Sequence, residues 1–157
     1  MLHSKSCLII LSLSASMFIS CGRCKTVGMF YVYNNTDRTL FMETNIIHHP
    51  SSWWTNTDLD IEQGDKKPIA QTKNYTGEKF HFDISDFVEN EDAYVKVYLD
   101  SFATVPIKEW KYIDRNSSGR QLFNLDFSVF SECGMVDGSN NLIYTFSIEN
   151  EDIKESK

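Results

Sequence analysis

Few side chains in this sequence have the types and the spacing that metal binding needs. His48 and His49 are adjacent, and adjacent residues of a strand point to opposite faces, so they make a poor chelating pair. His81 and Asp83 share a face, but it is the polar, solvent-facing side of an alternating segment. We therefore expect no metal site, and we interpret these side chains as solvated strand or loop residues.

Candidate catalytic residues are equally sparse. Asp58 and Asp60 form the kind of carboxylate pair that glycoside hydrolysis uses, but that reaction needs a deep cleft, which a domain this small rarely provides. Cys133 precedes Gly134, and no nearby residue suggests a partner that would stabilise its thiolate. The sequence has no Gly-x-Ser-x-Gly elbow, no glycine-rich phosphate loop and no His-Glu-x-x-His motif. We expect a protein that is not an enzyme and holds no cofactor.

The chemistry that the sequence does offer lies at Cys21 and Cys24, which follow an apolar N-terminal run. That run is too short, and too often interrupted by serine, to span a bilayer, which needs about 20 apolar residues. The layout of residues 1–20 is that of a secretory signal peptide. One interpretation is an ordinary signal that is cut after Ser16, with Cys21 there by chance.

We favour a lipoprotein signal instead. Phe18-Ile19-Ser20-Cys21 resembles a bacterial lipobox, in which a large apolar residue, a further residue and a small residue precede a lipidated cysteine. Each buried methylene of the attached acyl chains contributes about 0.8 kcal/mol, so such an anchor is effectively permanent. The predicted organisation is a signal peptide over residues 1–20 and a tether, lipidated on Cys21, over residues 21–26.

Charge and composition limit the classes of partner. The chain of 157 residues has a formal net charge of −7, and loss of the signal peptide with Lys5 makes the balance one unit more negative. This acidity disfavours nucleic acid and anionic membrane surfaces as partners. The remaining residues suffice for one domain, and 11 Phe, 7 Tyr and 3 Trp suit a β-rich core.

Apolar residues recur with a period of two along most of the chain, which predicts strands. "VGMFYVY" and "RTLFMET" flank Asn34-Asn35-Thr36-Asp37, a good hairpin turn, and predict a hairpin. "LDIEQGDKKPIAQT" predicts two weaker strands around Gly64-Asp65, with Pro68 tolerated near a strand start or on an edge. Further alternation covers residues 80–84, 94–99, 122–127 and 142–148.

Helix is confined to one or two short turns, within residues 85–93 and 106–115. In the second of these, Trp110 and Ile113 would share a buried face. We expect an antiparallel, immunoglobulin-like β-sandwich of seven to eight strands over residues 27–148. Residues 149–157 are predicted to form a flexible, charged tail.

A resemblance supports this organisation. The segments "AYVKVYLDS", "EWKYIDRNSSGRQLFNLDFSVF" and "NLIYTFSIE" resemble the second half of small lipoproteins from Bacteroidales, and the lipobox and the "VYNNTDRTL" hairpin fit their first half. The resemblance implies a cell-envelope lipoprotein with a sandwich domain, and it brings no known activity and no catalytic residues.

The residues after Cys21 bear on location. Gly22, Arg23, Cys24 and Lys25 are small or basic, apart from the cysteine, whereas acidic residues at these positions tend to mark export to the outer face in Bacteroidales lipoproteins. Their absence resembles the periplasm-facing class. We expect an outer-membrane lipoprotein that faces the periplasm, with surface exposure as the alternative.

Two features remain as candidate sites. Trp53 and Trp54 lie in the polar, loop-like stretch "HHPSSWWTNTD", where they would form a contact platform for a glycan or protein, or cap the open end of the sandwich. Cys24 and Cys133 are left as a free pair in an oxidising compartment. A disulfide between them would close a loop of roughly 110 residues, worth about 4–5 kcal/mol. The alternative is a tether thiol and a buried small apolar residue.

The function that follows is a lipid-anchored, non-catalytic binding or interaction module of the cell envelope. Its partners would be the membrane, through the lipid, and an envelope protein or glycan. The alternatives are a component of a carbohydrate-capture or surface-adhesion assembly, and a periplasmic immunity or inhibitor protein.

Overall fold

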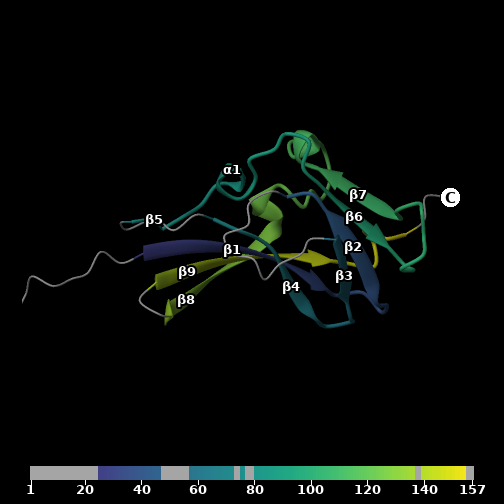
Figure 1. Cartoon of the computed structure of the whole chain (residues 1–157), viewed down its shortest axis with the longest axis horizontal. Coiled ribbons are helices and arrows are strands. Elements are labelled where there is room, and N and C mark those ends of the chain that lie inside the picture. The colour runs from purple at the N-terminus through teal and green to yellow at the C-terminus, as the bar shows by residue number, and fades with distance from the viewer. Residues whose placement is uncertain (1–24, 47–56, 73–74, 77–79, 137–138, 155–157) are drawn as a thin grey trace, which may run out of the picture.

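The computed structural model describes residues 25–46, 57–72, 75–76, 80–136 and 139–154. In chain order the elements are β1 (Lys25–Asn34), β2 (Leu40–Thr44), β3 (Thr57–Ile61), β4 (Lys66–Gln71), β5 (Tyr75–Thr76), α1 (Ile84–Phe87), β6 (Tyr94–Tyr98), β7 (Lys108–Lys111), the 3-10 turns η1 (Tyr112–Asp114) and η2 (Leu125–Phe127), β8 (Ser128–Val136) and β9 (Ser139–Ile148). Strand dominates helix, which confirms the predicted mainly β class (Figure 1).

The strands form two sheets. Sheet A has the order β4-β1-β9-β8, with β5 also pairing with β1, and sheet B has the order β3-β2-β6-β7. Residues that alternate along both sheets turn inward and form one hydrophobic cluster, so the two sheets make a β-sandwich. Aromatic rings fill much of the space between them, for example Trp110 of β7, which packs edge-on against Phe146 of β9 at a centroid distance of 5.5 Å.

The pairing of β1 differs from the expected hairpin. β1 pairs with β9 in parallel over its whole length and with β4 in antiparallel fashion, whereas β2 pairs with β3 and β6 in the other sheet. The prediction of a β1–β2 hairpin is therefore wrong. The polar residues do form a turn, but this turn carries the chain from sheet A to sheet B. A hairpin and such a crossing have the same sequence pattern, so the pattern cannot distinguish them.

Three further local predictions are wrong. Residues 80–83 are not a strand, and α1 begins after Asp83, which forms a capping box with Asp86. Trp110 is buried as predicted, but it lies on strand β7 and not on a helix, and Ile113 is exposed. Because strand and helix both allow an isolated buried Trp, the spacing to Ile113 misled the assignment.

Residues 122–127, predicted as a strand, instead end in the turn η2, after which the long strand β8 begins. Pro68 lies on β4, at the edge of sheet A, where a missing N–H is tolerated as expected.

The ends of the domain extend beyond the predicted boundaries. β1 begins at Lys25, within the expected tether. Residues 149–154 are not frayed: Ile153 is buried in the core, and Asp152 accepts a hydrogen bond from the Glu149 N–H at 3.0 Å and pairs with Arg120 at 3.4 Å. Burial of Ile153 and the contacts of Asp152 together hold this segment against the sandwich.

Candidate binding site

The outer face of sheet B carries a cluster of aromatic and charged side chains. In β2 the alternation buries Leu40 and Met42 and turns Phe41 and Glu43 outward. In β6 it turns Tyr94, Lys96 and Tyr98 outward. The antiparallel register places Phe41 opposite Tyr98 and Glu43 opposite Lys96, so these side chains meet across the two strands.

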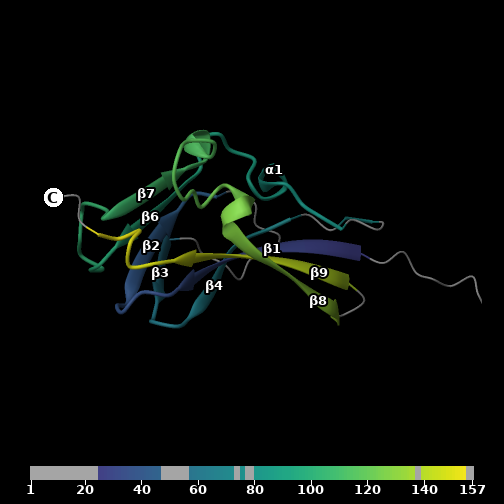
Figure 2. The same ribbon diagram turned by 180° about the vertical axis from the view of Figure 1, so that it is seen from behind.

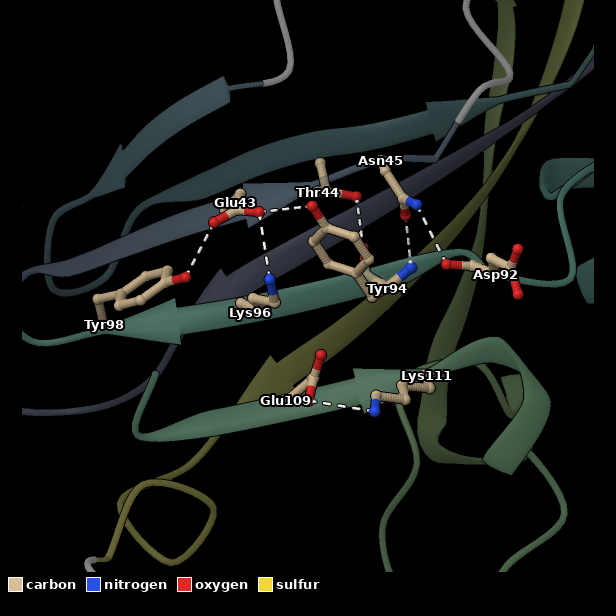
Figure 3. A network of polar contacts seen from close by, with 9 residues as sticks. All are labelled: Glu43, Thr44, Asn45, Asp92, Tyr94, Lys96, Tyr98, Glu109 and Lys111. Carbon is tan, nitrogen blue, oxygen red and sulfur yellow. Dashed lines mark hydrogen bonds and ion pairs between the residues drawn. The ribbon is translucent and has the colours of Figure 1, made fainter. Parts of the chain in front are cut away.

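Glu43 is the centre of this cluster (Figure 3). Its carboxylate accepts hydrogen bonds from the hydroxyl groups of Tyr94 at 2.5 Å and Tyr98 at 2.9 Å, and the Lys96 ammonium lies 3.4 Å away. These hydrogen bonds, that of Tyr94 first, hold the pKa of Glu43 below its usual value. The same bond raises the pKa of Tyr94 to about 12, and burial followed by the bond to Glu43 raises the pKa of Tyr98. An ionised Glu43 with both oxygens engaged therefore fixes the two rings and is a poor proton acceptor.

The cluster continues across the sheet as alternating charges. The Lys96 ammonium lies 4.3 Å from the centre of the Tyr94 ring, and on β7 the Lys111 ammonium lies 3.5 Å from a Glu109 oxygen (Figure 3). Exposed pairs of this kind contribute little to stability. Their effect is to hold the charged side chains in place beside the tyrosine rings on the outer face of sheet B.

A hollow of about 550 Å³ opens beside Tyr98. Its lining comes from β2, β3, β6 and the loop after β6, and comprises Phe41, Met42, Glu43, Asp60, Tyr98, Asp100, Ser101, Ala103 and Thr104. The volume lies within the range of small-ligand sites, about 300–1,000 Å³. Asp100 also organises the loop, because one of its carboxylate oxygens accepts the Phe102 N–H at 2.8 Å. The hollow thus combines two aromatic rings with three carboxylates.

The loop between β6 and β7, which lines the hollow with Ser101, Ala103 and Thr104, also carries two exposed apolar side chains, and we call these two the rim. Phe102 is 90% exposed and Val105 is 73% exposed. Figures 1 and 2 both show this loop at the end of the molecule opposite the start of β1. The loop that lines part of the hollow therefore lies at the end of the domain opposite the start of β1.

A second, smaller hollow of about 230 Å³ lies near α1 and η2, and His81, Asp83, Arg115 and Asp126 are among its lining residues. The hydroxyl of Tyr144 lies 3.2 Å from Nδ1 of His81 and accepts the Phe82 N–H at 2.8 Å. His81 and Asp83 are exposed.

No group of three or more His, Cys, Asp or Glu side chains in the described part of the chain is arranged to hold a metal ion. Nor does any described helix combine the length and the apolar character needed to cross a membrane.

Most of the sequence-predicted site residues lie outside the described residues. These are Cys21, Cys24, Trp53 and Trp54. Cys133 lies on β8 opposite Asn141 of β9, and Asn141 pairs on its other side with Val27 of β1. β9 therefore lies between β1 and the strand that carries Cys133. The bridge between Cys24 and Cys133 stays a prediction, because Cys24 lies outside the described residues.

Sequence reasoning missed the Glu43 cluster. A signal for it was present in the sequence, because the outward positions of β6 are Tyr, Lys and Tyr. Two tyrosines on the solvent-facing side of a strand form an aromatic surface that is not part of the hydrophobic core. What the sequence could not supply was the pairing of β6 with β2, which brings Glu43 to both hydroxyl groups.

Comparison with known proteins gives no relative: no family model, curated protein or solved structure matches this chain. Fold and site together define a β-sandwich domain with an aromatic, acidic hollow at one end.

Proposed function

We propose that this protein is a non-catalytic binding module of the bacterial cell envelope, anchored in the outer membrane by lipid on Cys21 and facing the periplasm. The observation that carries the binding role is the hollow beside Tyr98, with its exposed rim of Phe102 and Val105. Large apolar side chains that stay in water beside a formed hollow are typical of contact surfaces.

The position of the hollow supports the tethered arrangement. The described chain begins at Lys25, only a few residues after Cys21, at the end of the molecule opposite the β6–β7 loop (Figure 1). A lipid on Cys21 would hold the start of β1 near the membrane and present the hollow to the surrounding compartment. The acidic balance of the chain fits a partner other than the anionic membrane surface.

The binding role is tested with a pair of double variants. Phe102→Ser with Val105→Ser removes the rim, and Phe80→Ser with Ile113→Ser removes two side chains that are 70% and 68% exposed elsewhere on the domain. Cross-linking in the living cell, followed by purification in detergent, should recover a specific partner with the wild-type protein and the second variant, and lose it with the first. Equal recovery with both variants would contradict the proposal.

The anchor is tested separately. Cys21→Ala should move the protein from the membrane fraction to the soluble periplasmic fraction, and a variant that stays in the membrane would rule out this anchor. Antibody against the domain should label permeabilised cells but not intact ones. Strong labelling of intact cells would show that the domain lies on the outer surface, and it would not affect the proposal of a lipid anchor.

Trp53 and Trp54 allow a further test of the binding role. Replacement of Trp53 and Trp54 by Ala should leave the melting temperature unchanged and weaken partner binding if they form a contact platform. Truncation of a core Trp costs about 3–5 kcal/mol, so a large loss of stability would assign them to the core instead.

A glycan is the second candidate ligand, because Phe41 and Tyr98 are directly opposed on neighbouring strands beside Asp60 and Asp100. Aromatic faces stack on sugar rings, and carboxylates accept sugar hydroxyl groups. Calorimetric titration with neutral oligosaccharides should then show binding that Tyr98→Ala abolishes. Absence of heat with all of them would favour a protein partner.

A further inference from the structure

The edges of the two sheets differ in how well they are protected against pairing with another strand. β4 carries Lys66 and Pro68, β3 is five residues long and carries Asp60, and β7 is only four residues long and begins and ends with Lys108 and Lys111. Short length, charge and proline are the usual devices that keep an edge strand from recruiting another strand. Three of the four edges in the described sheets therefore have such a device.

β8 is the least protected edge. It is nine residues long, contains no Lys and no Pro, and its one charged residue is Glu132. Its pairing with β9 is regular from Ser128 to Cys133, and the register shifts only between Cys133 and Val136. It pairs only with β9 among the described strands, and both views show it at the border of sheet A (Figures 1 and 2). Val129 is 70% exposed and Phe130 is 45% exposed, so the edge is apolar on both faces. A long apolar edge of this kind is a template for an additional strand.

We propose that β8 pairs antiparallel with β8 of a second copy of this chain, so that sheet A continues across a twofold axis. A register centred on Phe130 places Phe130 opposite Phe130 of the second copy and Val129 opposite Ser131. Phe130 already packs on Tyr144 of β9 at a centroid distance of 5.3 Å, so the pairing extends one row of aromatic rings across both copies.

The same register agrees with the polar groups of the edge. It places Ser128 opposite Glu132 of the second copy, and the two side chains share a face because their partners on β9, Phe146 and Leu142, are both core residues. The Ser128 hydroxyl is the one buried side-chain polar atom without a hydrogen-bond partner in the described part of the chain. No like charges face each other within the paired strands. A contact that is complementary to itself is what a twofold dimer requires, which is why a second copy is the occupant that this edge fits.

The first experiment is sedimentation of the full chain carrying Cys21→Ser, which removes the acylation site. Val129→Lys should raise the dimer dissociation constant roughly ten-fold, since the change occurs twice across the axis. Ile113→Lys is the control, because it places the same charge at a similarly exposed aliphatic residue, 68% against 70%, in the turn η1, away from both β8 and the hollow. A monomeric parent protein, or equal weakening by both variants, would overturn the proposal.

Salt and cross-linking give independent readouts. Since each copy has a net charge of −7, added salt should strengthen an apolar contact between two copies, and weakening by salt would contradict it. With the native cysteines changed to Ser, Phe130→Cys should form a disulfide-linked dimer when treated with copper phenanthroline, because paired residues across antiparallel strands lie within about 5.5 Å. Ile113→Cys should not. These readouts do not depend on the hollow, so this proposal and the proposed function can fail separately.

Discussion

Replacement of Asn34 by Ala tests how the chain crosses from sheet A to sheet B. The Asn34 side chain is fully buried at the end of β1. Its Nδ2 group donates to the carbonyl oxygens of Arg38 at 2.7 Å and Ile61 at 2.8 Å. Its Oδ1 accepts from the N–H and the hydroxyl of Thr36 at 3.0 and 2.6 Å. One amide thus holds the turn between β1 and β2 and ties it to the end of β3.

The magnitude follows from the four hydrogen bonds. Each contributes about 1 kcal/mol net, and buried groups left without a partner cost about 1–3 kcal/mol, so Asn34→Ala should destabilise the domain by about 4 kcal/mol. Against a typical total of about 5–15 kcal/mol, this is a large part of the free energy of unfolding. With a urea m-value of about 2 kcal/mol/M, the unfolding midpoint should fall by about 2 M.

The control is the neighbouring asparagine. The Asn35 side chain makes one exposed hydrogen bond, to Glu149 at 2.6 Å, so Asn35→Ala should change the stability by no more than about 0.5 kcal/mol. Urea unfolding followed by circular dichroism would measure both variants. A loss below about 1 kcal/mol for Asn34→Ala, or equal losses for the two variants, would refute the assignment of the crossing to this side chain.

Three further results are expected. Gly28→Ala should destabilise the domain by about 1–3 kcal/mol in thermal unfolding, because its Cβ would lie 2.7 and 2.8 Å from two phenylalanine rings; an unchanged melting temperature would disprove this packing. Tyr94 should ionise near pH 12 instead of its usual 10, as followed by phenolate absorbance, and Glu43→Gln should bring that pKa down. Because the folded pKa is the higher one, this contribution to stability is complete below pH 10 and is lost as the pH rises toward 12. Mature protein purified from the envelope without reductant, which has lost Cys7 and carries lipid on Cys21, should show no free thiols, and two free thiols would rule out the Cys24–Cys133 bridge.

Prediction from the sequence was most accurate where the residue pattern of a segment fits only one type of secondary structure. Period-two alternation predicted the strands at residues 94–98 and 142–148, and the turn signal at Gly64 predicted the break between β3 and β4. Prediction failed where a segment of mixed polarity fits two structures. The stretch around Trp110 satisfied a short helix as well as a strand, and pairing with β6 decided for β7.

The sequence by itself determined the mainly β class, because the alternation that buries one face of each strand is a local property of the chain. Lipidation at Cys21 stays a prediction from the sequence alone, because the motif depends only on adjacent residues. Only the tertiary structure decided that β1 and β2 belong to different sheets and that β1 lies parallel to β9. Only it brought Glu43 to the hydroxyl groups of Tyr94 and Tyr98, which are 51 and 55 residues away, and left β8 as the least protected edge. The physical reason is that strand pairing joins residues through backbone hydrogen bonds that any sequence can make, so the choice of partners depends on the packing of the whole core.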